Sequence, residues 1–182
     1  MNTPNKLTLL RMILVPFFMA FALAGGTVWQ LAALAVFAIA SFTDYLDGKI
    51  ARAQGLVTTF GKFMDPLADK LLTTAAFLVF MDKGLISSWV IIIVLFREFA
   101  VSGIRLVAAG TGEIIAASWW GKLKTVSQMV AIILTFLLII VPVFPETVNY
   151  VIINIAVWIS TVLTLVSGWD YIYKNKSLLE FK

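Results

Sequence analysis

Four aspartates within a short stretch of this chain are the residues best suited to chemistry. Asp44 and Asp47 are three positions apart, and Asp65 and Asp69 are four positions apart. If each pair lies on a helix, its two carboxylates project from one face of that helix. Four carboxylates close together in a low-dielectric environment repel one another unless a cation lies between them or some stay protonated. The spacing therefore favours a metal site with oxygen ligands, which suits Mg²⁺ or Mn²⁺.

Two residues in the same stretch are suited to a phosphate ligand. Gly48 has no side chain and lets a ligand approach the backbone closely. Arg52, about one helical turn later, carries a planar guanidinium that can donate two parallel hydrogen bonds to phosphate. The alternative is that Arg52 only anchors a helix at the membrane interface. Its position among four carboxylates favours a phosphate bound by metal and arginine together.

The composition indicates an integral membrane protein. Hydrophobic residues make up 61% of the 182 residues, charged residues only 13%, and the mean hydropathy is +0.98. Cysteine and histidine are both absent, which excludes disulfides, thiolate zinc sites and histidine as a general base. The net charge of +4 does not come from a basic cluster interleaved with aromatics, so we expect no nucleic-acid partner.

Six apolar segments are long enough to cross a bilayer, which takes about 20 residues. They predict an all-α protein with six transmembrane helices that form one membrane-embedded domain over residues 1–182. The breaks fall at short stretches rich in glycine, proline or polar residues, the first of them at Gly25-Gly26-Thr27. The expected helices are Leu7–Val28, Leu31–Arg52, Gly61–Met81, Leu85–Ala108, Gly121–Val141 and Val148–Tyr171.

The distribution of basic residues predicts the orientation of these helices. Of the 14 lysines and arginines, only Lys83 falls in a turn on the side opposite to the termini. The positive-inside rule then places both termini, and the opening of the carboxylate site, on the cytoplasmic side of the cell membrane. The first segment also imitates a signal peptide, but its cleavage would put the basic C-terminal tail on the wrong side. We therefore expect it to be kept as the first span.

The aspartates are part of a longer pattern with eight fixed positions over 26 residues. The pattern D-x2-D-G-x2-A-R-x8-G-x3-D-x3-D resembles, without departure, the signature of the CDP-alcohol phosphotransferase family. The six expected spans also agree with that family, so the resemblance covers nearly the whole chain. The matching residues are Asp44, Asp47, Gly48, Ala51, Arg52, Gly61, Asp65 and Asp69.

The resemblance implies an activity and a role for each matching residue. Members of the family transfer a phosphatidyl or similar group from a CDP-linked donor to an alcohol, release CMP and use a divalent cation. It implies two metal ions, a homodimer, and Asp69 as both a metal ligand and the catalytic general base. The other implied metal ligands are Asp44, Asp47 and Asp65, and the implied CDP-binding residues are Gly48, Ala51, Arg52 and Gly61.

A polar seam in the second half of the chain is the candidate site for the acceptor alcohol. Glu98, Ser102 and Arg105 recur on one stripe of the fourth expected helix. Cations near this seam would bind an acceptor that carries its own phosphate. The structural alternative pairs Glu98 with an arginine between helices and lets the lysines extend to the interface. The candidate acceptor-phosphate residues are Arg97, Arg105, Lys122 and Lys124.

The strings around this seam resemble the phosphatidylglycerophosphate synthase branch of the family. So does the opening of the chain, whose Asn5 and Thr8 we expect near the nucleotide. The expected reaction transfers the phosphatidyl group of CDP-diacylglycerol to sn-glycerol 3-phosphate. One alternative is a family member with another acceptor, such as an inositol phosphate or phosphatidylglycerol. A cation transporter is a further alternative, but it leaves Arg52, Arg105 and Lys122 unexplained.

Two weaker patterns concern the ends of the helices. Asp170 and Lys174 are four positions apart and are expected to pair on the last helix. Tryptophans and tyrosines near helix ends are typical of the aromatic belts at membrane interfaces. The residues expected in these belts are Trp119, Trp120, Trp158, Trp169, Tyr171 and Tyr173.

Overall fold

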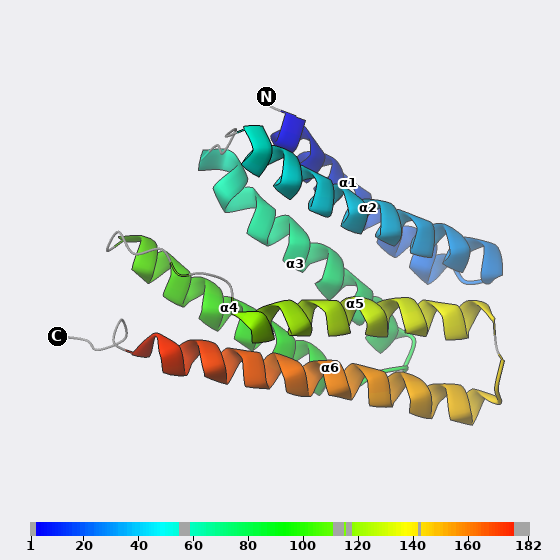
Figure 1. The fold of residues 1–182 in the computed structure, drawn as a ribbon. Coiled ribbons are helices and arrows are strands. Elements are labelled where there is room, and N and C mark those ends of the chain that lie inside the picture. The colour runs from blue at the N-terminus through cyan, green and yellow to red at the C-terminus, as the bar shows by residue number, and fades with distance from the viewer. Residues whose placement is uncertain (1–2, 55–58, 111–114, 116–117, 142, 177–182) are drawn as a thin grey trace. The chain divides into compact units, whose positions relative to one another are not determined.

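The computed structural model describes residues 3–54, 59–110, 115, 118–141 and 143–176. Within its helices, the side chains of residues 3–5, 44–54, 59–66, 69 and 109 lie outside the description. The described residues form six helices and no strand (Figure 1), which confirms the predicted all-α class. The helices are α1 (Thr3–Ala24), α2 (Thr27–Gln54), α3 (Thr59–Asp82), α4 (Ser88–Gly110), α5 (Trp119–Ile140) and α6 (Glu146–Lys174).

The first helix ends earlier than its apolar run suggests. The expected end at Val28 is wrong, because α1 ends at Ala24 and α2 already begins at Thr27. Gly25 and Gly26 both have positive φ, 75° and 77°, a conformation that glycine adopts without steric cost and that ends a helix. The side-chain amide of Gln30 donates a hydrogen bond of 2.8 Å to the Ala22 carbonyl, which ties the start of α2 to the end of α1.

Three stretches are long and apolar enough to cross a membrane within the part of the chain that the structure describes. They are Lys6–Ala24 in α1, all of α5 and all of α6, while Thr27–Thr43 in α2 is a shorter apolar stretch. By contrast, α4 carries Arg97, Glu98 and Arg105 in an otherwise apolar helix. The charges that interrupt α4 are therefore those of the predicted polar seam.

The chain divides into two compact units. The first unit comprises Met1–Asp82 and Phe136–Val143, so it holds all four signature aspartates. In it, α1 packs against α2 and α3, and α2 also contacts α3. Its core contains a chain of aromatic rings, in which Phe18 lies 5.8 Å from both Phe37 and Phe136 between ring centroids. The buried face of each helix thus fixes how the aspartate-bearing helices meet.

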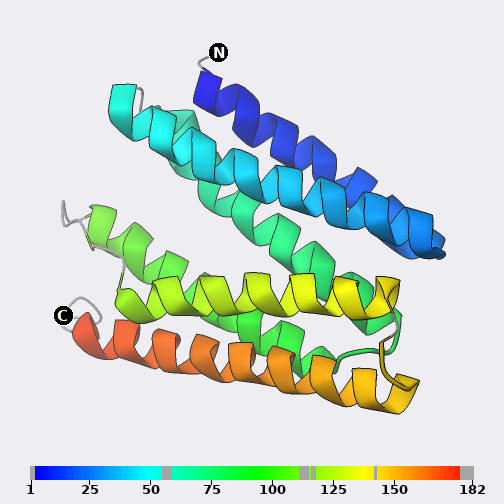
Figure 2. The ribbon, with the colours of Figure 1, turned by 45° about the vertical axis from the view of Figure 1, so that its right-hand side comes forward.

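The second unit comprises Lys83–Thr135 and Phe144–Lys182 and holds the polar seam. In it α4 packs against α6 and runs in the same direction, whereas the first part of α5 runs in the opposite direction (Figure 2). Several of the buried side chains along α6 are small and polar, which allows close helix packing. They include Ser160, Thr161, Thr164 and Ser167, each completely buried.

Hydrogen bonds from both halves of α6 join the elements of the second unit. Gln128 of α5 donates to the hydroxyl of Thr164 at 3.2 Å. The side-chain amide of Asn154 donates to the carbonyl of Leu85, in the connection that precedes α4, at 2.9 Å. Because both bonds join residues that are far apart in the sequence, they favour one arrangement of α4, α5 and α6.

Candidate active site

The four signature aspartates lie on two helices that pack against each other. Asp44 and Asp47 are on α2, and Asp65 and Asp69 are on α3. This confirms the expected helical spacing, which sets the two members of each pair about one turn apart. The side chains of all eight signature residues lie outside the described part of the structure. Their roles toward metal and CDP therefore stay predictions.

The donor chemistry of the aspartate frame fits a hard divalent cation. It offers only carboxylate oxygens, and the chain has no histidine or cysteine that would favour zinc or copper. Among the side chains that the structure describes, no group of three or more acidic residues could hold a metal ion. Within this chain, the aspartate frame is thus the set of residues whose chemistry matches the metal that the resemblance implies.

Polar residues near the start of α1 lie inside the first unit. Thr8 and Arg11 are completely buried, although α1 is one of the most apolar helices of the chain. The helix that carries them packs against α2 and α3, the two helices of the signature. The side chain of Asn5 lies outside the described residues. A role of Asn5 and Thr8 in CDP binding stays a prediction.

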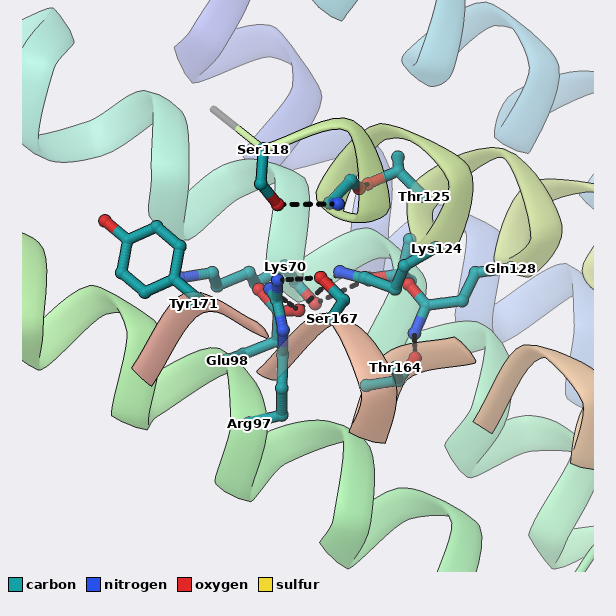
Figure 3. Close-up of polar contacts among 12 residues, drawn as sticks. Lys70, Arg97, Glu98, Ser118, Lys124, Thr125, Gln128, Thr164, Ser167 and Tyr171 are labelled. Carbon is teal, nitrogen blue, oxygen red and sulfur yellow. Dashed lines mark hydrogen bonds and ion pairs between the residues drawn. The ribbon is translucent and has the colours of Figure 1, made fainter. Parts of the chain in front are cut away.

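In the second unit, a buried ion cluster forms around Glu98 (Figure 3). Arg97 donates from Nη1 to Glu98 Oε1 at 3.0 Å, and Lys124 of α5 donates from Nζ to the same oxygen. The exposed fractions of the three side chains are only 9% for Arg97, 11% for Glu98 and 8% for Lys124. The structural pairing considered for Glu98 is therefore present, although its arginine comes from the same helix and its interhelical partner is a lysine.

Residues of α6 enclose Arg97 from the other side. The Nη2 atom of Arg97 donates to the Ser167 hydroxyl at 2.6 Å. A Cβ atom built on Gly168 would lie 2.8 Å from Arg97 Cγ, closer than real Cβ contacts occur. Gly168 therefore makes room for the arginine side chain. Sequence reasoning missed both residues, and a glycine inside an apolar helix was the available signal.

Arg105 and Lys122, the other two predicted phosphate-binding residues, are exposed. Arg105 donates from Nε to the Tyr171 hydroxyl oxygen at 3.2 Å, and its guanidinium carbon lies 5.5 Å from the centroid of the Tyr171 ring. Tyr171 is only 2% exposed and packs with Val101 and Ile104. Its predicted place in an interfacial belt is wrong, because α6 turns this ring toward α4.

The remaining belt aromatics agree better with an interface. They are all exposed: Trp119, Trp120, Trp158, Trp169 and Tyr173. The predicted pair of Asp170 and Lys174 is confirmed, with 2.7 Å between the carboxylate oxygen and Nζ. An open groove of about 600 Å³ runs along this region and is mostly apolar. Its walls are Trp120, Leu165, Val166, Trp169, Asp170 and Tyr173.

Apolar helices of membrane-spanning length, together with the eight-residue aspartate pattern on α2 and α3, are typical of enzymes that transfer phospho-groups within a bilayer. The model of one such family, CDP-alcohol phosphatidyltransferase, matches residues 1–166. The chain belongs to this family. The resemblance carried by the signature is thereby confirmed.

Three bacterial relatives show how far the similarity extends. A Bacillus subtilis (strain 168) protein named CDP-diacylglycerol--glycerol-3-phosphate 3-phosphatidyltransferase is 44% identical, over 98% of this chain and 97% of its own length. A Mycobacterium tuberculosis (strain H37Rv) protein named probable phosphatidylglycerophosphate synthase is 40% identical, over 94% of this chain and 80% of its own. An Escherichia coli (strain K12) protein with the same name as the first is 39% identical, over 72% and 74%.

The burial of Glu98 predicts a large effect on stability. Glu98→Gln keeps the shape of the side chain but leaves Arg97 and Lys124 buried without a carboxylate, which costs about 3 to 5 kcal/mol. As a matched control, Asp170→Asn removes a pair whose lysine is 61% exposed and should cost less than about 1 kcal/mol. Thermal unfolding of both variants in one detergent measures the difference. Equal, small losses would show that the Glu98 cluster does not hold the second unit together.

Proposed function

We propose that this chain transfers the phosphatidyl group of CDP-diacylglycerol to sn-glycerol 3-phosphate, giving phosphatidylglycerophosphate and CMP. The observation that carries this proposal is the intact eight-residue frame in a chain that is 44% identical, over nearly its full length, to a relative named for this reaction. The name of a second relative, probable phosphatidylglycerophosphate synthase, describes the same product. The proposed donor, acceptor and products follow from these names and from the residues that could bind them.

The proposed membrane arrangement has six spans, with both termini and the active site on the cytoplasmic side of the cell membrane. Basic residues support it, because the turns that would lie outside carry only Lys83 of the 14 lysines and arginines. The diacylglycerol tails of the donor would stay in the bilayer while its pyrophosphate meets the cytoplasm. The resemblance further implies that the enzyme works as a homodimer.

The donor site is proposed to form around the aspartate frame. Divalent cations, Mg²⁺ or Mn²⁺ and two in number, would neutralise the pyrophosphate and the departing CMP oxygen when bound. Arg52 would donate hydrogen bonds to a phosphate of CDP, with Gly48, Ala51 and Gly61 leaving room for the nucleotide. The carboxylates proposed to hold the ions are Asp44, Asp47, Asp65 and Asp69.

The proposed transfer is a single displacement at the β-phosphorus of the donor. The primary hydroxyl of glycerol 3-phosphate forms the new phosphorus–oxygen bond, and the bond from that phosphorus to CMP breaks. Asp69 accepts the proton of the attacking hydroxyl. In a chain without histidine or cysteine, a carboxylate is the available group that is already unprotonated near neutral pH.

The acceptor phosphate is proposed to bind at the cations of the second unit. Arg105 and Lys122 are exposed, so they can reach a soluble anion directly. Arg97 and Lys124 are buried against Glu98. They would contribute positive charge close to the acceptor rather than direct hydrogen bonds to it. These cations also favour an enzyme over a cation transporter, because a cation path gains nothing from nearby positive charge.

The choice of acceptor is tested by CMP release from CDP-diacylglycerol in mixed micelles. We expect release with glycerol 3-phosphate and little with an inositol phosphate or phosphatidylglycerol, because the relatives named above are named for the first of these acceptors or for its product. CMP release with one of the other alcohols instead would reassign the acceptor within the family. Cation flux in vesicles without any CMP release would replace the enzyme by a transporter.

Metal dependence follows from the proposed ligands. Excess EDTA should abolish CMP release, because four carboxylates and a pyrophosphate cannot meet without a counter-charge, and added Mg²⁺ or Mn²⁺ should restore it. The recovery is measured as initial rate against free metal concentration. Full activity in excess EDTA would contradict the metal site.

Asp69 should be essential for turnover. Asp69→Asn keeps the shape of the side chain but removes a proton acceptor and a ligand charge, so kcat should fall by about 10² or more. Asp82→Asn, at the exposed end of the same helix, is the control and should retain normal turnover. Near-normal turnover of Asp69→Asn would remove Asp69 from the mechanism.

A further inference from the structure

One face of α6 contacts both arginines of α4. Ser167, Gly168 and Tyr171 recur on this face at spacings of one helical turn or less, and we call these three residues the α6 strip. Ser167 and Gly168 contact Arg97, and Tyr171 contacts Arg105. All three residues are buried. None of them belongs to the eight-residue signature.

The contact between Tyr171 and Arg105 orients a cation that is otherwise exposed. The phenol oxygen accepts the Nε hydrogen of Arg105, and the guanidinium lies over the tyrosine ring. An arginine has five N–H donors, of which Nε carries one. The four donors on the two terminal nitrogens are therefore left for a ligand, in the planar arrangement that binds phosphate through two hydrogen bonds.

Tyr171 can orient Arg105 because the ring itself is fixed. It is 2% exposed and packs against Val101 and Ile104, on the same helix as Arg105. A buried aromatic ring held by its neighbours loses little further freedom when it binds a partner. A long exposed arginine, in contrast, must give up several rotamers to bind an anion unless it is already held.

The contacts of Arg97 have the same character. Its Nη2 atom reaches the Ser167 hydroxyl at 2.6 Å, and its aliphatic part passes where a Cβ of residue 168 would be. Glycine is unfavourable in the interior of a helix. Gly168 nevertheless lies inside α6, which runs from Glu146 to Lys174. The position needs a residue without a side chain because Arg97 occupies that space.

We infer that the α6 strip is a positioning element for the acceptor site, and that Tyr171 sets the affinity for the acceptor's phosphate by holding Arg105. This inference rests on the proposed function, in which Arg105 binds that phosphate. In this inference the strip acts through Arg97 and Arg105 rather than on the reacting atoms. Its loss should therefore weaken binding of the acceptor without slowing the chemical step.

Tyr171→Phe is the sharpest test, because it removes the hydroxyl and keeps the ring that packs and lies under the guanidinium. We expect the KM for glycerol 3-phosphate to rise about 3- to 10-fold, the effect of one lost hydrogen bond, with kcat and the KM for CDP-diacylglycerol unchanged. Tyr173→Phe is the matched control, since Tyr173 is 63% exposed two positions away. It should change none of these constants.

The same measurement in an Arg105→Ala background separates the inference from the function on which it rests. If Tyr171 acts through Arg105, adding Tyr171→Phe to Arg105→Ala should raise the KM no further. If Arg105→Ala raises the KM but Tyr171→Phe behaves like Tyr173→Phe, the inference is overturned and the acceptor site stands. If Arg105→Ala leaves the KM unchanged while the native enzyme still uses glycerol 3-phosphate, the reaction stands and both the acceptor site and the inference fall.

Gly168→Ala tests the other part of the strip without any substrate. The added Cβ should lower the unfolding temperature in detergent by several degrees, and clearly less so in an Arg97→Ala background, where the opposing Cγ is gone. Gly103→Ala is the control, because a Cβ at this helical glycine meets nothing within 4 Å. Equal effects of Gly168→Ala with and without Arg97 would show that Gly168 does not seat the arginine.

Discussion

A charged side chain inside an apolar helical protein must be matched by an opposite charge or by a ligand, since leaving it alone in a low dielectric costs several kcal/mol. Only 13% of the residues of this chain are charged. A charged residue that is buried among the others therefore needs a specific partner. Glu98 shows the solution in the second unit, where one carboxylate oxygen accepts hydrogen bonds from both Arg97 and Lys124. The aspartates of the first unit pose the same problem, negative charge in an apolar protein, and the proposed metal ions would answer it.

This matching also organises the helices. The ion cluster joins α4 to α5, and the bonds of Ser167 and Tyr171 join α4 to α6. Along α6 the hydroxyls of Ser160, Thr161 and Thr164 donate to carbonyls of their own helix, so they need no outside partner. Their small size lets neighbouring helices approach closely. Polar contacts between helices therefore add to the apolar core of the second unit, which includes Val90, Ile132 and Ile153.

The features that sequence reasoning predicted correctly are local ones. The spacing of the four aspartates within each pair indicates a helix from only a few residues. The glycine pair at 25 and 26 indicates a break without reference to the rest of the chain. Even so, the apolar run through Val28 hid the earlier end of α1, because hydropathy does not record that both glycines take a positive φ.

The features that it missed depend on which face of a helix meets another. Tyr171 near the end of α6 has the sequence context of an interfacial aromatic, and only the approach of α4 decides that its ring is buried. In the same way, sequence reasoning placed Lys124 among the four candidate phosphate-binding residues. It did not show that Lys124 contacts Glu98, 26 positions earlier. Partners that lie far apart in the chain become visible only once the helices are assembled.

The contact between Gly168 and Arg97 has a consequence for how this protein can diverge. A Cβ at position 168 would lie too close to Cγ of Arg97, so the residues that are tolerated at the two positions depend on each other. A side chain at 168 destabilises the protein while 97 remains arginine, and it costs less once residue 97 has become shorter. The less costly order of substitution is therefore one in which residue 97 of α4 shortens before residue 168 of α6 gains a side chain.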